Sequence, residues 1–103
     1  MFIGAAELRI YLPHSRSLKD KRMVLQSVLQ RSRNQCSISS AEVGMHDEQQ
    51  SALLGIALAA GEAAFAEERL QFTLGQIEQW LEEQGAQIAR VRYDVIPFWP
   101  HGE

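Results

Sequence analysis

The segment Ser17–Arg22, with the sequence SLKDKR, combines a helix start with a cluster of positive charge. Ser17 followed three positions later by Asp20, just before an apolar run, is close to a capping box and predicts the first residues of a helix. A helix N-terminus disfavours cations, yet the first turns carry Lys19, Lys21 and Arg22. Backbone N–H groups and these cations, with Arg16 nearby, could together bind a phosphate or a carboxylate.

The same residues also fit a solvated helix start in which Asp20 offsets the neighbouring cations. By helical phase Lys21 falls inside the inner apolar stripe, so we expect its stem on apolar surface and its ammonium near a strand end. Lys19 is expected to face water. Glu42 is an acid in an otherwise apolar strand, and phase alone suggests that it pairs with Lys21 or Arg22.

Charge is unevenly distributed along the 103 residues. Residues 1–40 hold seven Lys or Arg against two acids, a net of +5, whereas residues 41–89 hold one Arg against nine acids, a net of −8. Such an asymmetry lets one face meet a polyanion although the whole chain has a net charge of −3. A hydrophobic content of 46% indicates a globular protein, and one domain over residues 1–103 fits this length.

The apolar opening of the chain is too short for a signal peptide or a membrane span, because Glu7 and Arg9 interrupt it. We therefore expect a cytoplasmic protein with no membrane partner. Cys36 is the only cysteine, which excludes an intramolecular disulfide and a multi-cysteine metal site.

Hydrophobic periodicity predicts the order β-α-β-β-α-β, the split βαβ or ferredoxin-like arrangement of the α+β class. It implies a four-stranded antiparallel sheet with two helices on one face. The strand from Cys36 to Val43 is expected at a sheet edge with a bulge near residues 39–40, because its apolar residues change phase there. The predicted elements are strands at 2–12, 36–43, 50–60 and 87–98, and helices at about 17–34 and 61–84.

The face of the sheet without helices suggests two further contacts. In this topology the first strand lies between the third and fourth, so Arg9 and Tyr11 are expected beside Arg90 and Arg92 as a basic patch. The third strand shows only small and apolar residues there, which disfavours the base-stacking mode of an RNA-recognition domain. A face of small residues is typical of a subunit interface, so we expect a homodimer.

Aromatic residues supply a third possible contact. Phe65, Phe72 and Trp80 widen the apolar arc of the second helix, and they could pack on the first helix or form a self-association surface. Phe98 and Trp99 in the tail must be buried on this subunit or on a partner.

Several stretches resemble a known family. The opening segment FIGAAELRIYLPHSRSLKDKRMVLQSVLQRSRN, the later SAEVGMHD and the strand LLGIALAA together resemble the YlxP-like family of small bacterial proteins, a domain-of-unknown-function family. The resemblance covers nearly the whole chain, is most specific at SLKDKR and implies the ferredoxin-like fold. Family members commonly accompany genes for ribosome maturation and translation-initiation factors, which implies a role near ribosomal RNA. The chain departs from the family pattern after Asp47, at Glu48-Gln49; the matching positions are Ser17, Leu18, Lys19, Lys21, Arg22, Ala41, Glu42, Val43 and Asp47.

Enzyme functions find less support in the same residues. An acylphosphatase would place a glycine-rich loop after the first strand, and the loop at 13–16 has no glycine. His14, His46 and Asp47 lack the spacing of a metal-binding pair, so ordinary loop histidines are expected. Cys36 has neither an adjacent histidine nor a lysine in its own strand to activate its thiol, so a nucleophile is not expected.

The sequence therefore favours a non-enzymatic accessory factor for ribosomes or RNA, without a cofactor or metal. Its expected phosphate contacts are Arg16, Ser17, Lys19, Lys21 and Arg22, with a second group of Arg9, Arg90 and Arg92. The alternative is a homo-oligomeric protein-interaction module with no nucleic-acid role, in which SLKDKR is structural and the interface is formed by Phe72, Phe98 and Trp99. A small-anion binder or phosphate-processing enzyme is the third and least supported possibility.

Overall fold

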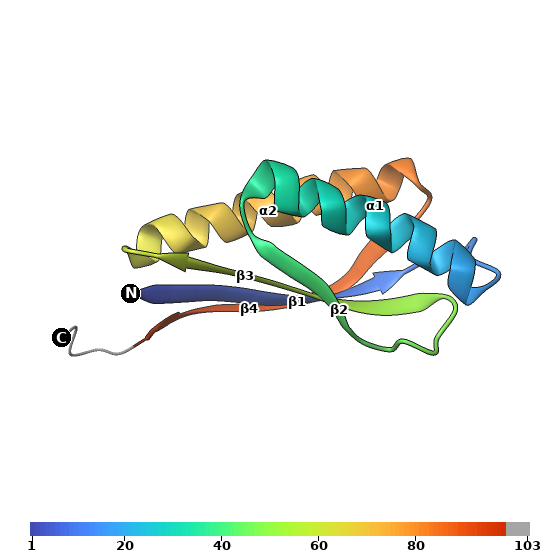
Figure 1. Ribbon diagram of the computed structural model, residues 1–103, viewed down its shortest axis with the longest axis horizontal. Helices are drawn as coiled ribbons and strands as arrows, with labels where there is room; N and C mark the ends of the chain where they lie inside the picture. Colours follow the sequence, from blue (N-terminus) through green and yellow to red (C-terminus); the bar gives the residue numbers. More distant parts are fainter. Residues whose placement is uncertain (99–103) are drawn as a thin grey trace.

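The computed structural model describes residues 1–98 and has the predicted order of elements (Figure 1). Four strands form one antiparallel sheet in the order β2-β3-β1-β4, and both helices lie on the same face of it. This is the ferredoxin-like arrangement. The elements are β1 (Phe2–Tyr11), α1 (Leu18–Cys36), β2 (Ser39–Gly44), β3 (Ser51–Ala60), α2 (Ala63–Glu83) and β4 (Gln87–Pro97).

The core lies between the sheet and the two helices. Alternate residues of β1 and β3 point toward the helices, because successive side chains of a strand point to opposite faces. Each fully buried Leu or Ile in this layer stabilises the fold by roughly 1.5–3 kcal/mol. The central buried residues are Leu8, Ile10, Leu54 and Ile56 of the sheet, with Leu25, Val28, Leu70, Ile77 and Leu81 of the helices.

The first helix is longer than predicted. It continues to Cys36, and Ser37 then ends it in the left-handed conformation with a φ of 55°. Cys36 is fully buried because it lies four residues after buried Ser32, on the same helical face. The prediction that Cys36 opens a strand is therefore wrong.

β2 is an edge strand, as predicted, but its irregularity lies elsewhere. The strand begins at Ser39, and its pairing with β3 shifts between Glu42 and Gly44 rather than near residues 39–40. Arg33 donates from Nε and Nη2 to the carbonyl of Ser40, at 3.2 and 2.6 Å. This edge carbonyl is thus bonded within the chain.

The second helix runs close to its predicted bounds and ends before Gly85, whose φ of 73° suits glycine. Its aromatic residues divide into two groups. Trp80 is buried in the core, with the Arg31 guanidinium 5.8 Å from its ring centroid. Phe65 and Phe72 remain about half exposed. In residues 1–98 neither helix is long and apolar enough to cross a membrane.

Candidate functional site

The start of α1 is capped from both directions. Ser17 Oγ accepts a hydrogen bond from the backbone N–H of Asp20 at 3.0 Å, as the capping box predicts. The Asp20 carboxylate reaches back and accepts from the backbone N–H of Arg16, also at 3.0 Å. Asp20 thereby places a negative charge in the first turn, which favours this helix end. The cap thus takes the N–H of Asp20 within the helix and that of Arg16 before it.

Lys21 lies inside the protein, with 1% of its side chain exposed. Its ammonium donates to the carbonyls of Met45 at 2.9 Å, Ser51 at 3.2 Å and His46 at 3.4 Å. Glu42 Oε2 lies 3.2 Å from the same nitrogen, an ion-pair contact without hydrogen-bond geometry. The predicted strand-end position of Lys21 and its pairing with Glu42 are both confirmed.

These contacts give Lys21 a different role from the phosphate contact expected of it. An ammonium already surrounded by four oxygens within the chain is not available to an external ligand. Lys21 instead fastens the β2–β3 hairpin to the start of α1. Gln50, just before β3, adds to this attachment, because its Nε2 donates to the carbonyls of Pro13 and Ser15 in the segment before α1, at 3.2 and 3.3 Å.

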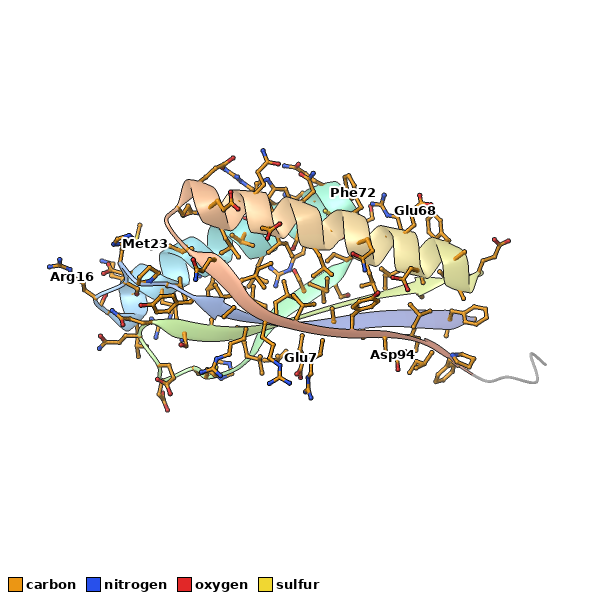
Figure 2. All side chains as sticks on the ribbon, turned by 180° about the vertical axis from the view of Figure 1, so that it is seen from behind. Glu7, Arg16, Met23, Glu68, Phe72 and Asp94 are labelled. Carbon is orange, nitrogen blue, oxygen red and sulfur yellow. The ribbon has the colours of Figure 1, made fainter. Side chains whose placement is uncertain are left out.

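The neighbouring cations have the opposite environment. Arg16, Lys19 and Arg22 are all exposed, and Figure 2 shows Arg16 at the end of the molecule where β1 leads into α1. Within residues 1–98 these three side chains form no ion pair or side-chain hydrogen bond. Arg22 also lines a groove of about 450 Å³ between α1 and β2, together with Arg33 and Glu42. They are the cations of SLKDKR and its flank that remain free for a ligand.

The second basic group, Arg9, Arg90 and Arg92, also contains cations in different environments. Arg9 and Arg90 are directly opposite each other on β1 and β4, both exposed, beside the bulge that separates Arg9 from Ile10 in this pairing. Two cations in opposing positions repel, so this pair is unfavourable unless an anion lies beside it. Arg92 instead pairs with Glu7 at 2.9 Å. Glu7, which is not among the residues predicted for this patch, lies on the same face because it is two residues before Arg9 on the same strand.

The predicted interface residues are only partly described. Phe72 is 47% exposed and Phe98 is 53% exposed. Arg69 covers one side of Phe72, with its guanidinium carbon 5.0 Å from the ring centroid. Trp99 lies outside the described residues. The small residues Gly55 and Ala57, predicted on the open sheet face, are found there, around a hollow of about 390 Å³ that Ala5 and Ala41 also line.

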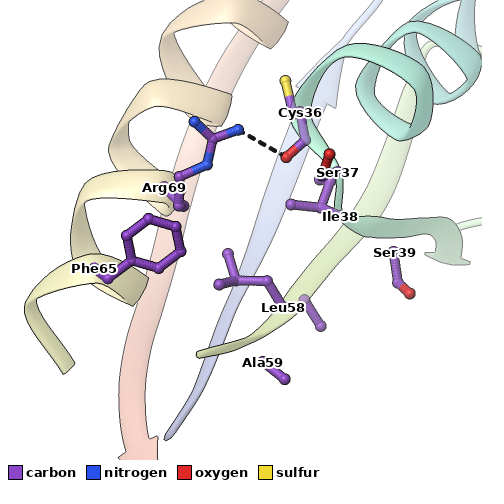
Figure 3. Close-up of a pocket in the computed structure, with 9 residues that line it drawn as sticks. Cys36, Ser37, Ile38, Ser39, Leu58, Ala59, Phe65 and Arg69 are labelled. Carbon is purple, nitrogen blue, oxygen red and sulfur yellow. Dashed lines mark hydrogen bonds between the residues drawn. The ribbon is translucent and has the colours of Figure 1, made fainter. Parts of the chain in front are cut away.

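A second cleft opens on the helical side, between the end of α1 and the first half of α2 (Figure 3). Its volume is about 330 Å³, and its lining includes Ile38, Leu58, Phe65 and the guanidinium of Arg69. That guanidinium donates to the carbonyl of Cys36 at 3.0 Å, so it is engaged within the chain. The described residues contain no cluster of three metal-ligating side chains.

Comparison with known proteins places these features in a family. Residues 3–92 match the family described as "Protein of unknown function (DUF503)". The uncharacterized protein YlxP of Bacillus subtilis (strain 168) is 35% identical over 80 residues, which cover 78% of this chain and 87% of that protein.

Two solved structures have a similar fold. A de novo designed protein with a ferredoxin fold superposes with a TM-score of 0.61 at 14% identity, over 96% of this chain and 88% of the designed one. A C-terminal segment of the alpha subunit of aIF2 from Pyrococcus abyssi superposes with a TM-score of 0.59 at 16% identity. That alignment covers 93% of this chain and about half, 49%, of the other. At these identities the likeness concerns the fold alone.

Proposed function

The chain belongs to the DUF503 family of proteins of unknown function, and we propose that it is a non-enzymatic factor that binds RNA through phosphate contacts at the start of α1. One observation carries this proposal: Arg16, Lys19 and Arg22 are exposed and unpaired among the described residues, at a helix start whose remaining cation, Lys21, is fully committed to the fold. Exposed, unpaired cations can neutralise phosphates at little desolvation cost.

The arrangement suits a phosphate backbone better than one small anion. A small anion needs donors that converge in a pocket, whereas Arg16 precedes the helix, Lys19 lies in its first turn and Arg22 follows one turn later. Cations spread in this way can contact successive phosphates. Such contacts position a nucleic acid without reading its sequence.

Arg9 and Arg90 extend this surface. β1 carries Arg9 two residues before its end at Tyr11, and the chain then turns into the start of α1. Both basic groups therefore lie toward the same end of the sheet. A phosphate beside Arg9 and Arg90 would relieve the repulsion between these opposing cations. Arg92 is left out of the proposed surface, because Glu7 already neutralises it.

Binding to bacterial ribosomal subunits and to total RNA at low and high salt tests the proposal. Ribosomal RNA is the first probe because the family resemblance implies a role near it. Two single variants form a matched pair: Arg22→Ala and Arg92→Ala each remove one exposed guanidinium. Arg22→Ala is expected to weaken binding and to reduce the slope of log K against log salt by about 0.7, the contribution of one contact to single-stranded RNA, whereas Arg92→Ala leaves that slope unchanged.

Three results would count against the proposal. Absence of binding by the wild type at either salt concentration would remove the RNA function and favour the protein-interaction module. Equal losses for Arg22→Ala and Arg92→Ala would show a response to net charge without a defined surface. Binding that does not weaken with salt would exclude phosphate contacts as its main source.

A further inference from the structure

The two edge strands of the sheet, β2 and β4, differ in length and in how far other parts of the chain bond or cover their outer sides. β2 has six residues, and Arg33 occupies the carbonyl of Ser40 on its outer side. β4 has eleven residues and is the other edge. In Figure 2 β4 crosses the front of the sheet with no helix or strand along its outer side. A long open edge is a template for pairing with another strand.

Hydrogen bonds at the end of β4 show which backbone groups face outward. The N–H of Phe98 donates to the carbonyl of Met1 at 2.8 Å, so Phe98 faces β1. Since backbone groups alternate in direction along a strand, Asp94 and Arg92 also face β1, and the odd-numbered residues 91, 93, 95 and 97 face outward. The outward N–H of Val95 is bonded by the Asp94 carboxylate at 2.8 Å. Pro97 has no N–H.

The backbone groups of Val91 and Tyr93 are therefore the open part of this edge. Their side chains are also unusual for their position. Both point to the helical face, opposite Leu8 and Ala6 of β1, yet Val91 remains 38% exposed and Tyr93 remains 45% exposed. Glu67 on α2 raises the pKa of Tyr93 through a side-chain hydrogen bond and its negative charge. Apolar surface thus continues to the edge of the molecule.

The charged side chains on the open face of β4 can pair with the same side chains of a second copy of β4 that runs antiparallel to it. Arg90, Arg92 and Asp94 follow one another on the open face. A two-fold axis at Arg92 places Arg90 of one copy opposite Asp94 of the other, twice, and brings the two Arg92 side chains opposite each other, each paired with Glu7 of its own chain. Axes at Val91 or at Asp94 instead oppose Arg90 to Arg92 or the two aspartates to each other, and within residues 1–98 neither Arg90 nor Asp94 has a counter-ion to reduce the repulsion.

An axis at Tyr93 also opposes unlike charges, but it fits the backbone less well. It requires the N–H of Val95, which Asp94 already occupies, and it uses Arg92, which is already paired with Glu7. With the axis at Arg92, Val91 of each copy exchanges both backbone hydrogen bonds with Tyr93 of the other. Arg90 is then the cation that gains a partner.

We propose that two copies of this chain pair through the outer edges of β4, antiparallel and in register about Arg92, so that Arg90 of each copy meets Asp94 of the other. The two sheets become one continuous sheet of eight strands, with all four helices on one face. Arg9 and the cations at the start of α1 stay exposed in the dimer and remain available to RNA, whereas Arg90 is then shared between the two proposed contacts. The interface is short, which places it toward the weak end of specific interfaces.

Exchanging the charges of Arg90 and Asp94 in the full chain tests the register between the two β4 strands. The mass of the protein is measured by sedimentation up to about 1 mM, where even weak association is visible. Arg90→Asp and Asp94→Arg are each expected to reduce dimer affinity by at least tenfold, and the double variant Arg90→Asp/Asp94→Arg to restore it. Rescue by Arg92→Asp/Asp94→Arg would instead place the axis at Tyr93 and overturn the proposed register.

Val91→Pro tests the edge itself. The Val91 N–H faces outward, so proline there removes an N–H that β1 does not use. The variant is expected to be monomeric with its circular dichroism spectrum unchanged, and Arg90→Asp gives the same readout if proline disturbs the strand. A wild-type protein that stays monomeric at every concentration would overturn the proposal. So would a dimer unaffected by these variants, which would place its interface elsewhere, such as the open face around Gly55.

Discussion

Lys19 and Lys21 are two residues apart in the same motif, and the structure gives them opposite environments. Lys19 faces solvent, whereas the ammonium of Lys21 is enclosed by three carbonyls and Glu42. Helical geometry is the cause, because a step of two residues turns a side chain by about 200° around the helix axis. A run of like charges at a helix start can therefore serve the fold with one member and solvent or a ligand with the others.

The comparison predicts that equal chemical changes at the two lysines have unequal effects. The largest effect is expected for Lys21→Met, which keeps the length of the side chain and removes its charge. Glu42 and the hairpin carbonyls then lose their partner, so the free energy of unfolding should fall by about 3 kcal/mol or more. Chemical denaturation measures this difference. The matched change Lys19→Met should alter it by less than about 0.5 kcal/mol. Similar values for both variants would contradict the buried role of Lys21.

The next effect concerns the acid in this attachment. Glu42→Gln keeps the shape of the side chain and removes its charge, so Lys21 retains its carbonyl partners and loses its counter-ion. We expect a loss of about 1 kcal/mol in unfolding free energy, because Glu42 is partly exposed and solvent screens part of the interaction.

Glu83→Gln is the surface counterpart of that change, since Glu83 pairs with Arg31 where both side chains are about half exposed. It should cost no more than about 0.5 kcal/mol. A double-mutant cycle of Lys21→Met and Glu42→Gln then isolates their coupling. Additive effects of the two substitutions would show that Lys21 acts through the carbonyls alone.

Removal of the helix cap is expected to lower the free energy of unfolding by about as much as Glu42→Gln does. Ser17→Ala removes the acceptor for the N–H of Asp20 and should destabilise the protein by about 1 kcal/mol, whereas Ser17→Thr, which keeps a hydroxyl, should cost less. Thermal unfolding of the two variants compares them. If RNA binds the side chains rather than the cap, Ser17→Ala should leave the affinity unchanged below the unfolding transition. A loss of binding as large as that of Arg22→Ala would make Ser17 a direct contact.

Much of this arrangement could be predicted from the sequence, because it depends on local periodicity. The capping pattern located the helix start, and the phase of Lys21 within the apolar stripe indicated its burial and its pairing with Glu42. The carbonyls of Met45 and Ser51 could not be anticipated, because they are 24 and 30 residues away and depend on how the hairpin folds back.

The errors have equally physical causes. The sequence pattern predicts Cys36 in a strand because the polar run before it obscures the helical phase that links it to Ser32. The topology correctly predicts Arg9 beside Arg90, but the pairing of Glu7 with Arg92 depends on the register between the first and last strands. Alternation along a strand gives the face of each residue, but the register is set by contacts between distant segments.

The central claim is that the exposed cations at the start of α1 bind phosphate while Lys21 holds the fold. Its most direct test is the salt dependence of RNA binding for the triple variant Arg16→Ala/Lys19→Ala/Arg22→Ala, which leaves Lys21 in place. We predict wild-type thermal stability and a slope of log K against log salt smaller by about 2, from three contacts at roughly 0.7 each on single-stranded RNA. A folded triple variant that binds RNA with the wild-type slope would contradict the claim.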